Sequence, residues 1–384
     1  FHNPEVRAAQ LDNARFWLDM GVDGFRLDTV NFYYHSQGLE NNPPVPGGLP
    51  KTLGVKHDNP YAFQLHQYDI SRPDNLQFLR ELRGVMDEYP GTTTVGEIGA
   101  DDPLQIMADY TADNDKLHMA YTFDLLNEPH SADYIRGVIN NLESKVGDGW
   151  PCWALSNHDV VRSNTRWGKG EDPQAFPRIA LAMLMCLRGS VCLYQGEELG
   201  LPEANVPYER IQDPFGLPFW PEYKGRDGCR TPMVWQQAPG GGFSTAESWL
   251  PVDEAQLPLS VDNQKSQPAD NQKSQPVDNQ QSQPLSTLAA VRQWIGWRQQ
   301  QPALIDGDIE VIAGTGDMLC WLRRCQEQQL LVALNLTGNH LSVPVASVFS
   351  GQLQAVLSGH GFNGRIEDGN IMLEPYQALF APLA

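Results

Sequence analysis

The strings GFRLD (24–28), TVGEI (94–98) and LSNHD (155–159) decide the fold that we predict for this chain. Each string sets an acidic residue at the end of an apolar, strand-like run, and helical segments lie between the strings. The acids are Asp28, Glu97 and Asp159. The C-terminal ends of parallel strands meet at one rim of a βα barrel, so acids placed there converge. The pattern therefore predicts an α/β fold, a (β/α)8 TIM barrel with three carboxylates at its C-terminal rim.

The residue types at this rim indicate one kind of chemistry. Cleavage of a glycosidic bond needs one protonated carboxyl group and one ionised carboxylate beside an oxocarbenium-like centre. A single Asp at a strand end is more often a turn or capping residue. Only the joint pattern of the three strings therefore favours a catalytic role.

Five runs indicate barrel strands, because parallel strands buried on both faces are continuously apolar. The expected strands span 22–28, 92–98, 120–126, 152–157 and 190–196, and the expected helices span 4–20, 73–88, 131–146 and 173–188. The first helix has Asn3 as its N-cap and Pro4 at its first position. Five strands correspond to strands 4–8 of the barrel. We therefore expect the first three βα units to be missing and the chain to be an N-terminally truncated fragment with an open sheet edge.

The domain organisation follows from a change in pattern near residue 303. Residues 1–303 are expected to form the C-terminal part of the barrel, and residues 304–384 a C-terminal antiparallel β-sandwich domain. The expected strands of the second domain are IEVIAG (309–314), MLCWLRRC (318–325), LLVALNL (330–336), GQLQAVL (351–357) and IMLEPYQALFAP (371–382).

A low-complexity repeat at 261–284 reads VDNQKSQP, ADNQKSQP and VDNQQSQP. Such a short, polar period is not expected to bury a face of its own, so we predict a surface loop. Its Asp residues do not indicate a calcium site, because Gln and Lys occupy the other ligand positions. A helix is expected to follow it at 287–301.

The composition of the chain disfavours several classes of binding partner and indicates a cellular location. The net charge of −20 disfavours nucleic acid and anionic membranes. The longest apolar run, 179–194, is interrupted by Arg188 and does not reach the length of a membrane span. The six cysteines form no CxxC pair and have no metal-ligand spacing, so we expect reduced, structural thiols and a cytoplasmic location.

With these residues in place, the chain resembles the α-amylase family of glycoside hydrolases (family 13). GFRLD, GEI and SNHD are similar to three of its signature strands, and RDGCRTPMVW (226–235) is similar to the RDxxRTPMxW motif of its α-glucosidase and oligo-1,6-glucosidase branch. The opening FHNPEV resembles the stretch that follows the family's QPDLN motif. The resemblance covers the whole chain, and four motifs occur in the family's order.

The resemblance implies a role for each acid. Asp28 matches the nucleophile, Glu97 the acid/base catalyst with a raised pKa, and Asp159 the carboxylate that binds sugar hydroxyls and stabilises the charged transition state. Arg26 lies two residues before Asp28 on the same strand and therefore on the same face, where its charge would keep Asp28 ionised. His158 is expected to hydrogen-bond beside Asp159. Arg26 and His158 could instead be satisfied structural groups.

Three further residues are candidates for substrate binding. Arg226 resembles a sugar-binding residue, although it could merely pair with Asp159 or Asp227. Phe123 is similar to an aromatic residue that lines the pocket, although it could be plain core. Thr29 follows the nucleophile, and in similar enzymes a Thr here accompanies α-1,4 activity whereas a Val accompanies α-1,6 activity.

Five other residues receive no functional role. Glu197 and Glu198 follow the last expected strand, where a structural salt bridge is the stronger interpretation. The histidines His57, His66 and His118 have no partners at metal-ligand spacing.

The resemblance implies a retaining α-glucosidase that acts on maltose and short α-glucosides through a covalent glucosyl-enzyme intermediate, with transglucosylation. The alternatives are an α-1,6-glucosidase, a sucrose-active transglucosylase and a non-catalytic homologue. The expected partner is a small α-glucoside such as maltose, a short malto-oligosaccharide or sucrose, and the protein is expected to be a monomer or homodimer. No cofactor is expected in this chain. The family's DxxxNH string, its domain B and a possible structural Ca²⁺ loop would lie upstream, so we expect residues 1–384 alone to be inactive.

Overall fold

The structure is a computed structural model that describes residues 1–48, 60–127, 129–169, 171–266, 285–349 and 353–383. Its chain forms two compact units. The first comprises Phe1–Phe123 with Ile139–Trp153, and the second comprises Asp124–Val138 with Ala154–Ala384. The predicted boundary at residue 303 is a different division and stays a prediction.

The first unit is built on parallel strands, as the apolar runs predicted. The strands are β1 (Gly24–Leu27), β2 (Thr93–Gly96), β3 (Met119–Thr122) and β4 (Pro151–Trp153), and they neighbour one another in that order. Each is shorter than its predicted run. The strand register pairs Leu27 with Gly96, so Asp28 and Glu97 follow directly at the same edge.

Close packing at the start of β1 depends on a glycine. A Cβ atom at Gly24 would lie 2.0 Å from the backbone oxygen of Thr93, its partner in β2. No side chain fits there without moving the two strands apart. The glycine of GFRLD therefore sets the pairing that brings the two acidic strand ends together.

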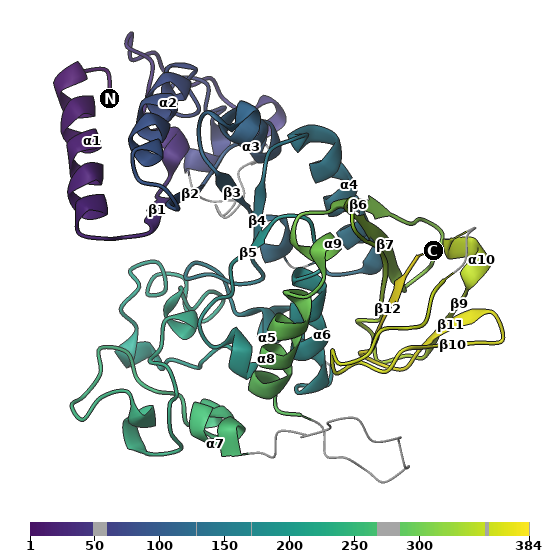
Figure 1. Ribbon diagram of the computed structural model, residues 1–384. Coiled ribbons are helices and arrows are strands. Elements are labelled where there is room, and N and C mark those ends of the chain that lie inside the picture. Colours follow the sequence, from purple (N-terminus) through teal and green to yellow (C-terminus); the bar gives the residue numbers. More distant parts are fainter. Residues whose placement is uncertain (49–59, 128, 170, 267–284, 350–352, 384) are drawn as a thin grey trace. The chain divides into compact units, whose positions relative to one another are not determined.

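The helices of the first unit cover this sheet. They are α1 (Pro4–Asp19), α2 (Asp74–Asp87) and α3 (Pro103–Thr111), while α4 (Ala132–Val146) begins in the second unit and ends in the first. The side chain of Asn3 accepts from the backbone N–H of Glu5, which confirms the predicted N-cap. Helices α1 and α2 (purple and blue in Figure 1) share a core that includes Leu18 and Val85. Helix α3 was not predicted, although Asp102 caps it.

The second unit holds the strand β5 (Ser190–Val191), the remaining helices and a long segment of short turns. The helices are α5 (Ser163–Arg166), α6 (Ala175–Leu184), α7 (Val261–Ser266), α8 (Thr287–Arg298), α9 (Pro302–Ile305) and α10 (Val345–Val348). Helices α6 and α8 pack together. Between β5 and α7 the chain forms 3-10 turns at Glu197–Leu199, Tyr208–Arg210, Asp227–Cys229, Pro239–Gly242 and Glu254–Leu259.

The prediction that the whole repeat is a surface loop is wrong for its first residues. These residues form α7, in which Val261 and Gln264 are buried. The Gln264 amide donates to the backbone oxygens of Leu199 and Leu259 and accepts from the backbone N–H of Leu288. Two positions on one helical face thus suffice to bury the start of a polar repeat. Residues 267–284 lie outside the described residues.

The predicted C-terminal antiparallel domain is confirmed. One sheet has the order β12-β8-β7-β6 and the other the order β10-β11-β9. Their strands are β6 (Asp308–Val311), β7 (Leu319–Arg324), β8 (Gln329–Leu334), β9 (Leu341–Pro344), β10 (Arg365–Glu367), β11 (Asn370–Leu373) and β12 (Ala378–Pro382). Residues of both sheets, such as Leu331 and Ile371, share one core, as in a sandwich. Figure 1 shows this domain in green and yellow.

Two of the predicted C-terminal strands are corrected. In the described part of 351–357, Leu353 makes only an isolated bridge with Leu383. The run 371–382 is divided into β11 and β12 by a turn that includes Tyr376, whose φ of 57° is incompatible with a continuous strand.

Two observations bear on the surroundings of the protein. No helix in the described parts of the chain combines the length and apolarity that crossing a bilayer requires. The six cysteines, all within the described residues, form no disulfide bond, and four of them, Cys152, Cys186, Cys229 and Cys320, are buried.

Candidate active site

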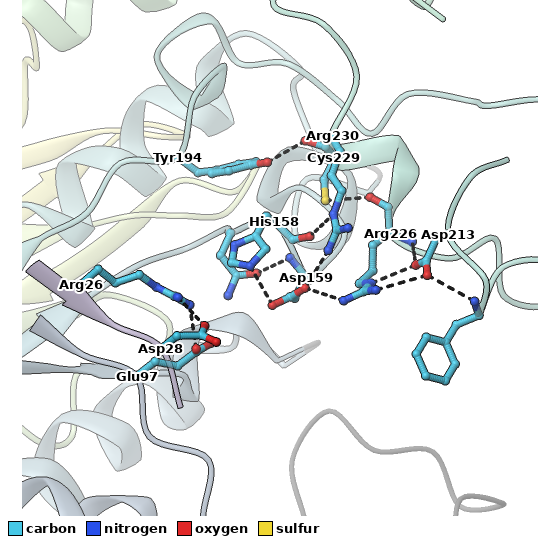
Figure 2. Close-up of polar contacts among 12 residues, drawn as sticks. Arg26, Asp28, Glu97, His158, Asp159, Tyr194, Asp213, Arg226, Cys229 and Arg230 are labelled. Atoms are coloured by element: carbon cyan, nitrogen blue, oxygen red, sulfur yellow. Dashed lines mark hydrogen bonds and ion pairs between the residues drawn. The ribbon is translucent and has the colours of Figure 1, made fainter. Parts of the chain in front are cut away.

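The first unit brings Arg26, Asp28 and Glu97 together. The side chain of Arg26 donates from Nη1 to Asp28 Oδ1 at 2.5 Å and from Nη2 to Glu97 Oε2 at 2.6 Å (Figure 2). Backbone hydrogen bonds between the adjoining strand ends fix this geometry, since the N–H of Glu97 donates to the oxygen of Leu27 at 2.9 Å. The prediction that Arg26 faces Asp28 is confirmed, and the same guanidinium also holds Glu97.

The two carboxyl groups have different surroundings. The side chain of Asp28 is 73% exposed, whereas that of Glu97 is 14% exposed. Burial is the largest influence on Glu97 and raises the pKa of its carboxyl group, the Arg26 guanidinium opposes the rise, and the Asp28 carboxylate adds to it. An exposed carboxylate beside a carboxyl group with a raised pKa is the kind of pair that glycosidic bond cleavage requires.

Thr29 and Phe123 also lie in the first unit. Thr29 is left-handed, with a φ of 40°, and its backbone N–H donates to Glu97 Oε2 at 3.3 Å. A β-branched residue rarely adopts this conformation, and such strain is characteristic of functional sites. The Phe123 ring follows β3, is half-buried, and stacks with Tyr121 at a centroid distance of 6.1 Å.

The second unit brings His158, Asp159 and two arginines together. Asp159 Oδ1 accepts from Arg226 Nη1 at 3.0 Å and from Arg230 Nη2 at 2.9 Å, and Asp159 Oδ2 lies 3.2 Å from His158 Nε2 (Figure 2). Nε of Arg230 donates to the backbone oxygen of His158 at 2.7 Å. The predicted contact of His158 with Asp159 is confirmed. Arg226 does pair with Asp159, which was the structural alternative for this residue.

The RDGCR segment places both arginines beside Asp159. It forms a 3-10 turn at Asp227–Cys229, so that Arg226 and Arg230 flank the turn. A Cβ at Gly228 would lie 2.4 Å from Glu203 Oε1 and 2.6 Å from the backbone oxygen of Ala204, so only glycine allows this close approach. Burial of Glu203 raises the pKa of its carboxyl group to about 7.

Two residues of this cluster were missed by the sequence reasoning. Arg230 was quoted in the motif without a role, and its spacing of four from Arg226 was the available signal. Asp213 binds Arg226 and is fully buried, but no pattern around it distinguished it from other loop aspartates.

The remaining titratable candidates have structural surroundings. Glu197 is buried and accepts from Ser163 Oγ and from the backbone N–H of Tyr194, so its contacts are hydrogen bonds rather than the predicted salt bridge. Glu198 accepts from the backbone N–H of Gly196.

The histidines without an assigned role include one with a carboxylate partner. His66 is buried between Asp69, at 2.8 Å, and the backbone oxygen of Tyr61. His118 accepts from the backbone N–H of Thr94. His57 lies outside the described residues. Among the described residues, no group of His, Cys, Asp and Glu could hold a metal ion.

The comparisons identify the class of protein that these features define. Residues 1–307 match the family model of the α-amylase catalytic domain. The chain is 41% identical to a probable α-glucosidase of Rhizobium meliloti over 388 residues, which is 100% of this chain and 66% of that protein. It is 24% identical to the probable oligo-1,6-glucosidase 2 of Bacillus subtilis, over 98% of this chain and 68% of that protein. The chain therefore belongs to the α-amylase family of glycoside hydrolases, and it spans about two thirds of the length of these relatives.

Two solved structures are similar to this chain in fold. The α-glucosyl transfer enzyme XgtA is 42% identical, with a TM-score of 0.90 over 100% of this chain and 68% of its own. An isomaltulose synthase from Klebsiella is 22% identical with a TM-score of 0.80, over 100% of this chain and 69% of its own, and supports the fold alone.

Proposed function

We propose that the protein carrying this chain is a retaining α-glucosidase that removes terminal α-linked glucose from maltose and short α-glucosides. The observation that carries the proposal is the Arg26 guanidinium shared by an exposed Asp28 and a largely buried Glu97 whose pKa is raised. Family membership supports it, because curated relatives are named α-glucosidases and oligo-1,6-glucosidases.

In the proposed first step, an oxygen of Asp28 forms a bond to the anomeric carbon as the bond to the leaving oxygen breaks. The proton of Glu97 passes to that oxygen, so the leaving sugar departs as a neutral alcohol. Arg26 holds the Asp28 carboxylate by a hydrogen bond and is its counter-ion. Glu97 is then an ionised base, with Arg26 as its counter-ion.

In the proposed second step, a hydroxyl group attacks the glucosyl-enzyme intermediate. Glu97 takes the proton of the attacking group, and the Asp28 carboxylate leaves. This second inversion at the anomeric carbon restores the original configuration. Water as the attacking group gives hydrolysis, and a sugar or alcohol gives transglucosylation. The second outcome is the alternative function with specific support, because the 42% identical XgtA is an α-glucosyl transfer enzyme.

We propose that the Asp159 cluster also takes part in catalysis, because SNHD resembles a signature strand of the family. Its carboxylate would bind sugar hydroxyls and stabilise the positive charge of the transition state, with His158 at its side and Arg226 and Arg230 fixing its position. Phe123 would line the pocket as an aromatic wall.

For the linkage, we propose a preference for α-1,4 over α-1,6 bonds, with Thr29 as the discriminating residue. Its backbone is bound to Glu97, so its side chain is held next to the catalytic pair. The test compares initial rates on maltose and isomaltose. Thr29→Val is the matched variant, because it keeps the β-branch and replaces only the hydroxyl group with a methyl group, and it should shift the ratio toward isomaltose. Faster isomaltose cleavage by the unaltered protein would contradict the preference.

The proposal is tested against its rivals with Asp28→Asn in the protein that carries this chain. An α-glucosidase should lose nearly all turnover, while binding of glucose persists. A sucrose-active transglucosylase would be recognised by product analysis with sucrose and maltose. A non-catalytic homologue would bind sugars equally well with and without the substitution and would turn over neither.

The broader setting is also proposed. We propose a cytoplasmic monomer or homodimer that binds neither nucleic acid nor membranes, because the net charge is −20 and the six described cysteines form no disulfide bond. Catalysis as proposed uses no cofactor.

A further inference from the structure

The cluster around Asp159 contains a buried carboxylate that the proposed mechanism does not use. We infer that Asp213 is a positioning residue that neutralises and orients Arg226, so that the negative charge of Asp159 remains available to the transition state. The inference rests on the proposed function, in which Asp159 stabilises positive charge at the anomeric carbon.

Asp213 is dedicated to Arg226. Its side chain is 0% exposed, and its Oδ2 accepts both from the backbone N–H of Arg226 at 2.8 Å and from Arg226 Nε at 2.9 Å. Its Oδ1 accepts from Arg226 Nη2 at 3.2 Å and from the backbone N–H of Phe215 at 3.2 Å. Burial alone would raise the pKa of Asp213, but these hydrogen bonds lower it below the usual range, so the carboxylate is ionised.

Arg226 is shared between two carboxylates. One edge of its guanidinium binds Asp213, and Nη1 binds Asp159 (Figure 2). The ring of Phe215 lies 5.9 Å from its central carbon, within the range of a cation–π contact. Gly225 permits the approach, because a Cβ there would lie 3.0 Å from Oδ2 of Asp213 and its φ is 78°. The orientation of Arg226 is therefore set before any substrate binds.

The charges of this network balance. Asp159 and Asp213 carry two negative charges, and Arg226 and Arg230 carry two positive charges. Without Asp213, the network around Asp159 would have a net positive charge. That charge would oppose the oxocarbenium-like transition state, whereas it would affect a neutral ground-state sugar little.

The test compares a cationic and a neutral ligand. Dissociation constants are measured, at one pH, for deoxynojirimycin, a protonated imino sugar, and for glucose. If one unit charge is lost roughly 10 Å from a bound cation, at an effective dielectric constant of about 20, the affinity for that cation changes about tenfold. Asp213→Asn, which keeps the side chain's shape, should therefore weaken deoxynojirimycin about tenfold relative to glucose and lower kcat more than it raises KM.

Asp253→Asn is the matched control. Asp253 also holds a loop of this unit, accepting from the backbone N–H groups of Ala255 and Asn205 at 2.9 and 2.7 Å, but no arginine contact places it in the cluster. Its substitution should leave the ratio of the two dissociation constants unchanged. A thermal melt of each variant checks that loss of the loop's structure is not the cause.

A second variant should change the affinity for deoxynojirimycin in the opposite direction. Arg226→Gln makes the network negative and should strengthen deoxynojirimycin relative to glucose, and the double variant with Asp213→Asn should return the ratio close to that of the unaltered protein. An unchanged ratio in a folded Asp213→Asn variant, or a shift in the same direction for both single variants, would overturn the role of Asp213. By contrast, an unaltered protein that cleaves no α-glucoside would overturn the proposed function itself.

Discussion

Replacement of Arg26 by Gln should move the pH profile of the enzyme toward alkaline pH. Arg26 donates to Glu97 Oε2 at 2.6 Å, and the Glu97 side chain is only 14% exposed, so its charge is weakly screened. With charge centres about 4 Å apart and an effective dielectric constant of about 20, the pair is worth about 4 kcal/mol, or about three pKa units. Because the Arg26 charge lowers the pKa of Glu97, we expect that pKa to rise in the variant.

The direction in which the pH profile shifts follows from the proposed role of Glu97. Glu97 must be protonated to donate to the leaving oxygen, so kcat/KM falls as the pH rises through its pKa. When Arg26 is lost, that pKa rises, and the alkaline limb of the profile should shift upward by about one to three pH units. The maximum rate should fall as well, because Asp28 loses the cation that holds its carboxylate in place.

The assay measures kcat/KM for a chromogenic aryl α-glucoside across the pH range in which both variants remain folded. Arg26→Lys is the matched control, because it keeps the charge and loses the forked geometry. Its alkaline limb should move less than that of Arg26→Gln. An alkaline limb that stays in place, or moves to lower pH, in Arg26→Gln would refute the assignment of Glu97 as the acid held by Arg26.

Three further predictions concern stability. Folding raises the pKa of Glu203 from 4.5 to about 7, so the stability due to its neutral form is present below about pH 4.5 and is lost as the pH rises through 7. In urea titrations, Glu203→Gln should therefore raise the free energy of unfolding by about 1–3 kcal/mol at pH 8 and leave it unchanged near pH 4. Equal differences at both pH values would contradict this. Gly24→Ala would place Cβ against Thr93 and should cost at least about 3 kcal/mol, whereas Gly84→Ala on the open face of α2 should not destabilise the protein. Gln264→Ala should cost about 1–3 kcal/mol, because it leaves buried backbone groups without partners; a variant as stable as Lys265→Ala on the exposed face of α7 would refute that role.

Much of the fold could be predicted from local patterns. The apolar runs located the strands that carry the acids, and the alternation of two along β1 placed Arg26 on the face of Asp28. Predicted strands were too long because the chain leaves the sheet to position functional groups, as the left-handed Thr29 does immediately after Asp28. Helix α7 was missed because its burial depends on Gln264 contacting backbone far away in the sequence.

The candidate site was predicted where one motif supplied all the information. Asp159 and Arg226 were recognised from their own strings, but the partner that holds Arg226 lies 13 residues away in an irregular loop. Arg230 meets Asp159 across 71 residues through the geometry of a 3-10 turn. The spacing of four from Arg226 was a signal for Arg230, but no sequence pattern marked Asp213, so only the three-dimensional structure could reveal Asp213 as part of the cluster.

The central claim is that Asp28 forms the glucosyl-enzyme bond while Glu97 transfers the proton, and one measurement tests it most directly. The protein and its Glu97→Gln variant are mixed with α-glucosyl fluoride and quenched, and their peptides are analysed by mass spectrometry. Fluoride leaves without a proton from Glu97, but attack by water needs a base, so the variant should accumulate a glucosyl adduct on the peptide that contains Asp28. An adduct on another carboxylate, or a variant that turns over the fluoride as fast as the unaltered protein without any adduct, would contradict the account.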